Sequence, residues 1–194
     1  MNTYKHISVT PLTLAVGAEI GQINIAGGVD DETFREVHAA LMDHGVVFFR
    51  GQDLTATQQC DFAGRYGRLR RATRSAFLVE EGVPEMHVLL NDKDRPPNVN
   101  HFHSDGIFRA EPEFASILRA VECPQVGGDT IFVGMQAAYN ALSGDMKTYL
   151  ADKGAVNDFM KLHGSLKKRR TGKVTISSAW MRPAAPIRRS PTPW

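Results

Sequence analysis

His103 and Asp105 are the two side chains of this sequence whose types and spacing most directly suggest chemistry. Residues two apart on an extended segment point to the same side, so an imidazole nitrogen and a carboxylate oxygen could reach one metal ion. A histidine and a carboxylate are two of the three protein ligands in the facial triad that holds non-haem Fe(II). The pair predicts an incomplete metal site, and a surface turn or a satisfied buried histidine is the alternative that it leaves open.

A third ligand is not evident beside the pair. His101 would share the face of His103 and Asp105 on a regular strand, but four strand residues span roughly 13 Å, too far for one ion. We therefore expect His101 on a pocket wall or on the surface. His163 is the only histidine after Asp105. Without a third nitrogen or oxygen ligand, a zinc hydrolase is disfavoured.

The composition is globular, but the charge is unevenly spread. The 194 residues suffice for one domain with a core, and the net charge is +2. Eight lysines and arginines and no acidic residue follow residue 164, which leaves 15 basic and 21 acidic side chains before it.

Cys60 and Cys123 make no disulfide framework, so a reducing, cytoplasmic location is expected. No apolar run has the length of a transmembrane helix, so no membrane partner is expected.

Short apolar runs between turn residues predict a β core with flanking helices, not an alternating α/β sheet. Asp30 or Asp31 caps a helix that ends at Gly45, and a capping box at residues 55–58 opens a second helix, which Gly67 ends. The other expected elements are helices at residues 135–142 and 143–150 and strands at residues 7–9, 20–25, 46–49, 86–90, 115–121 and 130–133.

Seven segments, in order and with matching spacing, resemble the taurine dioxygenase (TauD/TfdA) family of Fe(II)- and 2-oxoglutarate-dependent oxygenases. The resemblance runs from about residue 7 to about residue 159 and implies a mainly β (α+β) fold, a double-stranded β-helix or jelly roll with flanking helices. The matching segments are residues 17–20, 44–52, 62–69, 103–105, 116–120, 127–130 and 138–143.

The resemblance implies that His103 and Asp105 hold Fe(II), with 2-oxoglutarate and O2 as cosubstrates. In such enzymes 2-oxoglutarate is decarboxylated to succinate and CO2 while the substrate is hydroxylated, and the protein positions the reactants. Thr130 matches the family position whose hydroxyl binds the far carboxylate of 2-oxoglutarate. A solvent-facing strand threonine is the alternative for Thr130.

The resemblance implies a small organic substrate, which we expect to be anionic. Arg70, Arg71 and Arg74 could attract such a molecule, and a solvated basic loop is the alternative. Ala72 and Val99 stand where taurine-specific members carry the His and Asn that engage substrate, which argues against taurine itself. Homo-oligomerisation stays open.

The family pattern ends near Gly164 in this sequence. The family's second metal-binding His and the Arg that pairs with 2-oxoglutarate lie further downstream in the family, and His163 comes too early to replace that His. We expect a C-terminally truncated, incomplete jelly roll: a dioxygenase domain in residues 1–163 and a basic, proline-containing tail in residues 164–194, disordered or translated out of frame. This chain alone is then expected to bind Fe(II) weakly and to give no turnover.

Two other functions compete with the enzyme. The first is a non-catalytic remnant or pseudoenzyme fragment of the same fold. The second is a nucleic-acid binder that uses the basic residues 167–170 with Trp180 and Trp194. A tail that is translated out of frame could contain the same basic residues and tryptophans without any function. No nucleic-acid partner is therefore expected.

Overall fold

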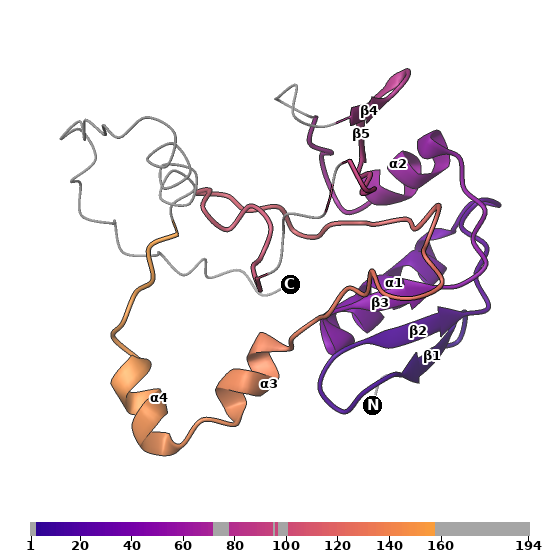
Figure 1. The fold of residues 1–194 in the computed structure, drawn as a ribbon. Helices are drawn as coiled ribbons and strands as arrows, with labels where there is room; N and C mark the ends of the chain where they lie inside the picture. Colours follow the sequence, from indigo (N-terminus) through magenta and orange to yellow (C-terminus); the bar gives the residue numbers. More distant parts are fainter. Residues whose placement is uncertain (1–2, 72–77, 95, 97–100, 158–194) are drawn as a thin grey trace, which may run out of the picture. The chain divides into compact units, whose positions relative to one another are not determined.

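The computed structural model describes residues 3–71, 78–94, 96 and 101–157 (Figure 1). The chain divides into two units, Met1–Gly154 and Ala155–Trp194, and all the elements below belong to the first. The predicted boundary between residues 163 and 164 lies outside the described residues, as does the predicted tail.

A three-stranded sheet forms the N-terminal part of the fold. β1 (Ser8–Pro11) pairs antiparallel with β2 (Ala18–Gly21), and β2 pairs parallel with β3 (Val47–Phe49). Parallel neighbours need a crossover connection. α1 (Asp31–His44) provides it and packs against β2 and β3 (Figure 1).

The ends of α1 are defined by local hydrogen bonds, as the sequence predicts. Asp30 is the N-cap, and its carboxylate accepts a hydrogen bond of 2.7 Å from the backbone N–H of Thr33. Gly45 takes a left-handed conformation with φ of 71°, and its N–H donates to the carbonyl oxygen of Leu41 at 2.7 Å. A side chain with a Cβ rarely adopts this φ, which explains the glycine at the end of the helix.

The predicted capping box opens α2 (Ala56–Gly64). The N–H of Thr55 donates to the Gln58 side chain at 2.8 Å, and the N–H of Gln58 donates to the Thr55 hydroxyl oxygen at 3.2 Å. Two backbone groups that lack helical partners are thereby satisfied. The helix ends at Gly64, earlier than the predicted stop at Gly67.

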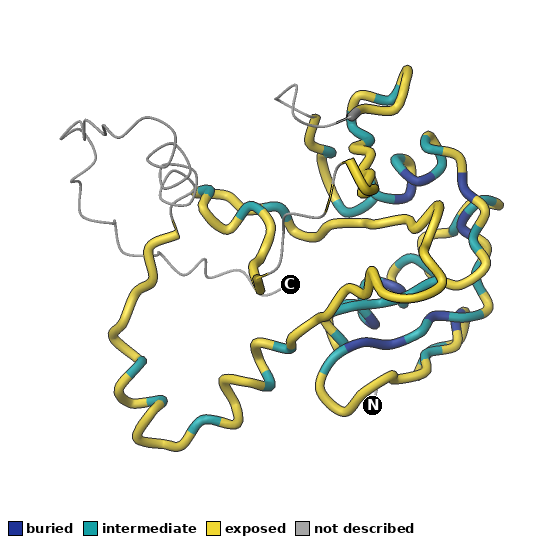
Figure 2. Tube along the Cα trace, viewed as in Figure 1, coloured by how far each residue is buried: buried dark blue, intermediate teal, exposed yellow. Residues whose placement is uncertain are grey.

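The core lies where α1 and α2 meet the sheet (Figure 2). Phe62 of α2 meets Phe34, Phe49 and Tyr66 edge to face, with ring centroids 5.9–6.0 Å apart. Such aromatic pairs contribute beyond their buried area. Burial raises the pKa of Tyr66 to about 12. The buried hydrophobic residues are Ile7, Ala18, Ile20, Ile25, Val37, Ala40, Leu54 and Phe62.

A hairpin follows the core, and the sequence predicts only its second strand. β4 (Leu78–Glu80) pairs antiparallel with β5 (Val83–Val88), with an irregularity between Val79 and Glu80. The strand expected at residues 86–90 begins and ends earlier. Gly82 lies in the two-residue connection between the strands and has φ of 78°. A two-residue connection that ends in glycine, between two apolar runs, is typical of a hairpin and is the sequence pattern that indicates the first strand.

Two predicted strands are absent from the described structure. Residues 115–121 and 130–133 have no strand conformation, although their sequences are apolar and β-branched. A strand needs a hydrogen-bonded partner strand, and none of the strands in the described residues pairs with either segment, although the Phe132 ring contacts Phe48 of β3. The strand predictions at residues 115–121 and 130–133 are therefore wrong for this structure.

The last two described helices agree with the sequence. α3 (Met135–Asn140) and α4 (Gly144–Leu150) occupy the expected stretches, and the Ser143 hydroxyl caps α4 by accepting from the Met146 N–H at 3.2 Å. None of the helices in the described part of the chain is long and apolar enough to cross a membrane.

Candidate metal centre

His103 and Asp105 lie together, as predicted. His103 Nε2 is 3.3 Å from Asp105 Oδ1, and 46% and 67% of the two side chains are exposed. Imidazole nitrogens and carboxylate oxygens bind a zinc-sized divalent ion at about 2.0–2.2 Å, so two ligands at a right angle lie roughly 3 Å apart. The pair therefore fits two adjacent coordination positions on one metal.

The segment that carries the pair is bent, contrary to the extended strand that the sequence predicts. Residues 102–104 have no regular conformation, and a turn begins at Asp105. Gly106 has φ of 65°, and its carbonyl oxygen accepts from the Arg109 N–H at 2.9 Å. A Cβ at Gly106 would overlap the Glu113 carboxylate. The turn, not strand alternation, brings the carboxylate to the imidazole.

His101 is closer to His103 than a regular strand would place it. The two ring centroids are 5.6 Å apart because the chain bends here. The described residues nevertheless contain no group of three or more His, Cys, Asp or Glu side chains able to hold a metal ion. His163 lies outside the described residues. Among the described residues, His103 and Asp105 therefore have no third candidate ligand beside them.

Each ligand of the pair has a second polar atom that another group engages. His103 Nδ1 is 3.1 Å from the carbonyl oxygen of His101, and Asp105 Oδ2 accepts from the Ser116 hydroxyl at 3.1 Å. With Nδ1–H donating to the carbonyl, the lone pair of Nε2 stays available for a metal. Residue spacing does not predict the contact between Ser116 and Asp105, although Ser116 begins one of the family-like segments.

Thr130 is exposed and is not joined to the pair. Within the described residues, no hydrogen bond links Thr130 to His103 or Asp105. Gly127 and Gly128, which precede it, have φ of 79° and 77°.

Two of the three arginines expected to attract an anion are paired with carboxylates. Arg70 and Arg109 both approach Glu113, with Arg109 Nε 3.3 Å from its Oε1. Arg71 Nε is 2.6 Å from Glu85 Oε1, and this hydrogen bond lowers the pKa of the Glu85 carboxyl. Arg70 and Arg71 thus form ion pairs within the chain. Arg74, Ala72 and Val99 lie outside the described residues.

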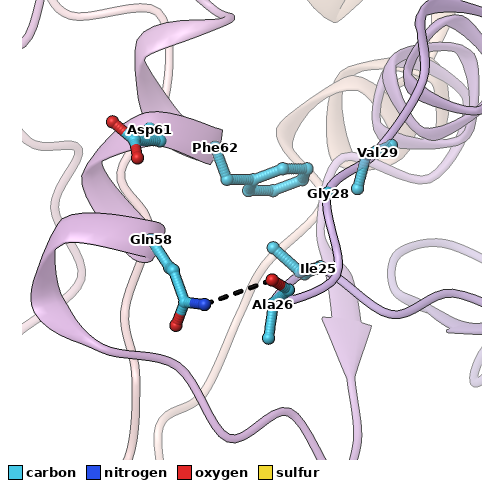
Figure 3. A pocket seen from close by; sticks show the side chains of 7 residues that line it. All are labelled: Ile25, Ala26, Gly28, Val29, Gln58, Asp61 and Phe62. Atoms are coloured by element: carbon cyan, nitrogen blue, oxygen red, sulfur yellow. Dashed lines mark hydrogen bonds between the residues drawn. The ribbon is translucent and has the colours of Figure 1, made fainter.

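One small cavity lies away from the pair, between α2 and the loop that precedes α1 (Figure 3). Its volume is about 190 Å³, and Gln58 Nε2 donates across it to the Ala26 carbonyl oxygen at 3.1 Å. Ligand pockets for drug-sized molecules have about 300–1,000 Å³. Asp61 is its one ionisable lining residue, so it supplies no ligand set or acid–base pair. The lining residues are Ile25, Ala26, Gly28, Val29, Gln58, Asp61 and Phe62.

Comparison with known proteins gives one consistent result. The family model for "Taurine catabolism dioxygenase TauD, TfdA family" matches residues 8–183, which extends past Gly164. An alkylsulfatase from Acinetobacter baylyi is 31% identical over 158 residues, which cover 80% of this chain and 48% of the relative. An alpha-ketoglutarate-dependent sulfate ester dioxygenase from Pseudomonas putida is 34% identical over 148 residues, which cover 76% and 48%.

Solved structures agree. A taurine dioxygenase from Burkholderia xenovorans is 30% identical, with a TM-score of 0.66 over 76% of this chain and 52% of that one. AAD-2, solved with Mn(II) and N-oxalylglycine, is 22% identical with a TM-score of 0.57, which supports the fold alone. The chain spans about half the length of the curated relatives it matches.

Proposed function

Because this chain belongs to the taurine catabolism dioxygenase (TauD, TfdA) family, we propose that it carries part of the active site of an Fe(II)- and 2-oxoglutarate-dependent dioxygenase. The observation that carries the proposal is the 3.3 Å approach of His103 Nε2 to Asp105 Oδ1. One imidazole and one carboxylate on adjacent positions match two-thirds of the facial triad. The donor set therefore fits Fe(II).

In the proposed site His103 and Asp105 hold the metal, and Thr130 donates its hydroxyl to the far carboxylate of 2-oxoglutarate. Fe(II), with 2-oxoglutarate and O2, would supply the oxidising chemistry that side chains lack. The protein's contribution is to aim Nε2 at the ion. The Nδ1 contact with the His101 carbonyl would hold the imidazole ring in this orientation.

The proposed substrate is a small organic anion. Support comes from the relatives' names, which include sulfate esters and 2,4-dichlorophenoxyacetate. We place the protein in the cytoplasm, since its two cysteines, Cys60 and Cys123, are free. The proposed complete fold is a jelly roll, to which the described strands contribute one part.

The second candidate is a non-catalytic remnant of the same fold. One observation favours it: the described residues offer two candidate ligands instead of three. A site with two protein ligands is expected to bind Fe(II) weakly and to give no turnover alone.

Anaerobic titration of the chain with Fe(II), followed by calorimetry, tests the proposal. Binding is expected in the wild type and is lost in His103→Ala and in Asp105→Asn. His44→Gln, which removes an imidazole from the end of α1, serves as the matched control and keeps the binding. Equal binding by the wild type and both ligand variants would show that the pair is not the metal site.

Succinate release from 2-oxoglutarate in air then separates the two candidates. Metal binding without succinate favours the remnant. Iron-dependent succinate release that His103→Ala abolishes would establish an active enzyme and overturn the expected inactivity of this chain.

A further inference from the structure

Asp105 presents its two carboxylate oxygens to different neighbours. Oδ1 faces His103 Nε2 at 3.3 Å, and Oδ2 accepts a hydrogen bond of 3.1 Å from the Ser116 hydroxyl. A free carboxylate can rotate and can bind a metal through either oxygen or through both. The Ser116 contact occupies Oδ2 and leaves Oδ1 directed toward the position where His103 would also bind a metal.

Ser116 lies in a stretch of chain that the core holds on both sides. The Phe114 ring stacks on His38 of α1, with centroids 5.6 Å apart and planes 2° apart. The buried Gln59 of α2 donates from Nε2 to the Ile117 carbonyl oxygen at 3.3 Å. The Arg119 guanidinium donates to the Leu54 carbonyl oxygen. Core contacts before and after Ser116 therefore determine where its hydroxyl lies.

The bent segment around Asp105 is shaped by the turn at Gly106 and by the contact of His103 with the carbonyl of His101, and Glu113 at its end pairs with Arg70. The Ser116 hydroxyl is thus a link between a metal ligand and a stretch anchored on α1 and α2. Partners that orient metal ligands typically change metal affinity 10–100-fold when they are removed.

We infer that Ser116 is a positioning residue, which orients Asp105 so that Oδ1 and His103 Nε2 face one metal ion. The inference rests on the proposed function, because it takes His103 and Asp105 as the ligands. Ser116 does not itself bind the metal. Its hydrogen bond is exposed to water and contributes little to folding, so its removal should change metal binding and leave stability nearly unchanged.

Titration of the whole chain with Co(II), followed by visible absorption, tests this inference without any turnover. Ser116→Ala is expected to weaken Co(II) binding roughly tenfold and to change the absorption spectrum of the bound ion. Ser116→Thr and Ser116→Val form a matched pair, since they have nearly the same shape and only Thr keeps the hydroxyl. The Co(II) affinity should stay near the wild-type value in Ser116→Thr and fall in Ser116→Val. Ser8→Ala in β1 controls for the loss of a hydroxyl elsewhere.

The outcomes separate this inference from the proposed function. If His103→Ala binds Co(II) as tightly as the wild type, the proposed function fails. If His103→Ala loses binding while Ser116→Ala and Ser116→Val keep wild-type affinity, only the role of Ser116 is overturned. If Ser116→Ala also lowers the urea midpoint, loss of stability and loss of the hydroxyl are separated by comparing Ser116→Thr with Ser116→Val. Equal Co(II) affinity in those two variants contradicts the inference.

Discussion

Residues 7–66, the core segment, and residues 101–157, the ligand segment, differ in how their side chains are covered. Every buried residue that the structure describes lies in the core segment (Figure 2). The ligand segment contains none, although Ile131 and Leu118 are as apolar as the residues of the core and remain 72% and 67% exposed. Apolar sequence alone does not make a core, because burial needs a second surface to pack against.

The two segments also differ in what defines their conformation. Helix caps, a parallel strand pair and close-packed rings define the core segment. In the described structure the ligand segment contacts it through Phe114, Ile117, Arg119 and Phe132. The metal pair thus depends on a few hydrogen bonds and one turn. Substitutions in the two segments should therefore affect different measurements.

The largest effect is expected from Phe62→Ala in the core segment. Removing a ring that contacts Phe34, Phe49 and Tyr66 should lower the free energy of unfolding by about 3–5 kcal/mol, measured in urea. Phe102→Ala is the matched control, since that ring is 72% exposed, and its effect should stay within about 0.5 kcal/mol. Equal losses in the two variants would show that the ligand segment has a core of its own.

Gly106→Ala should act on metal binding instead of folding. Alanine is strained at φ of 65°, and its Cβ would also displace the Glu113 carboxylate, so the turn after Asp105 is expected to shift. Strain of about 1–3 kcal/mol corresponds to a loss of roughly tenfold or more in Co(II) affinity. Gly82→Ala has a similar φ of 78° but open space around it, and should leave Co(II) affinity unchanged. A fall in affinity in both variants would contradict the local explanation.

Thr55→Ala should have a moderate effect on the core segment. It removes the hydroxyl that accepts from the Gln58 N–H at the start of α2, which typically costs about 1 kcal/mol of stability. Urea denaturation measures the loss. Thr55→Ser, which keeps the acceptor, should recover most of it, and a failure of Ser to do so would assign the effect to the methyl group.

A smaller, pH-dependent effect is expected at Glu36 of α1. Desolvation raises the pKa of this carboxyl, but the N–H groups of Lys5, His6 and Ile7 together outweigh it, and the pKa lies below the ordinary 4.5. The ionised form therefore stabilises the fold above pH 4.5, and this contribution is lost as the pH falls through the lower folded pKa. The stability difference between the wild type and Glu36→Gln should shrink on acidification, and a constant difference between pH 7 and pH 3 would contradict this.

The sequence predicts local features better than features that depend on distant partners. The Asp30 cap, the Gly45 stop and the capping box at Thr55 need only neighbouring residues, and all three are present. The strands expected at residues 115–121 and 130–133 need partner strands, and none pairs with them in the described part of the chain.

The metal pair shows the same limit at atomic scale. Spacing predicts that His103 and Asp105 meet, but strand alternation gives the wrong reason, since the turn at Gly106 brings them together. The hydroxyl of Ser116 lies eleven residues further along the chain, and only the fold reveals its contact with Asp105.

Hydrogen exchange of the whole chain, followed by mass spectrometry of its peptides, tests the difference between the two segments most directly. Backbone amides in α1 and β2 should exchange slowly, because they open only with the core. Amides of residues 101–113 should exchange fast. Addition of Mn(II) should slow exchange around His103 and Ser116 while leaving α1 unchanged. Exchange in residues 101–113 as slow as in α1 without metal would contradict the distinction, because the segment around His103 would then unfold together with the core.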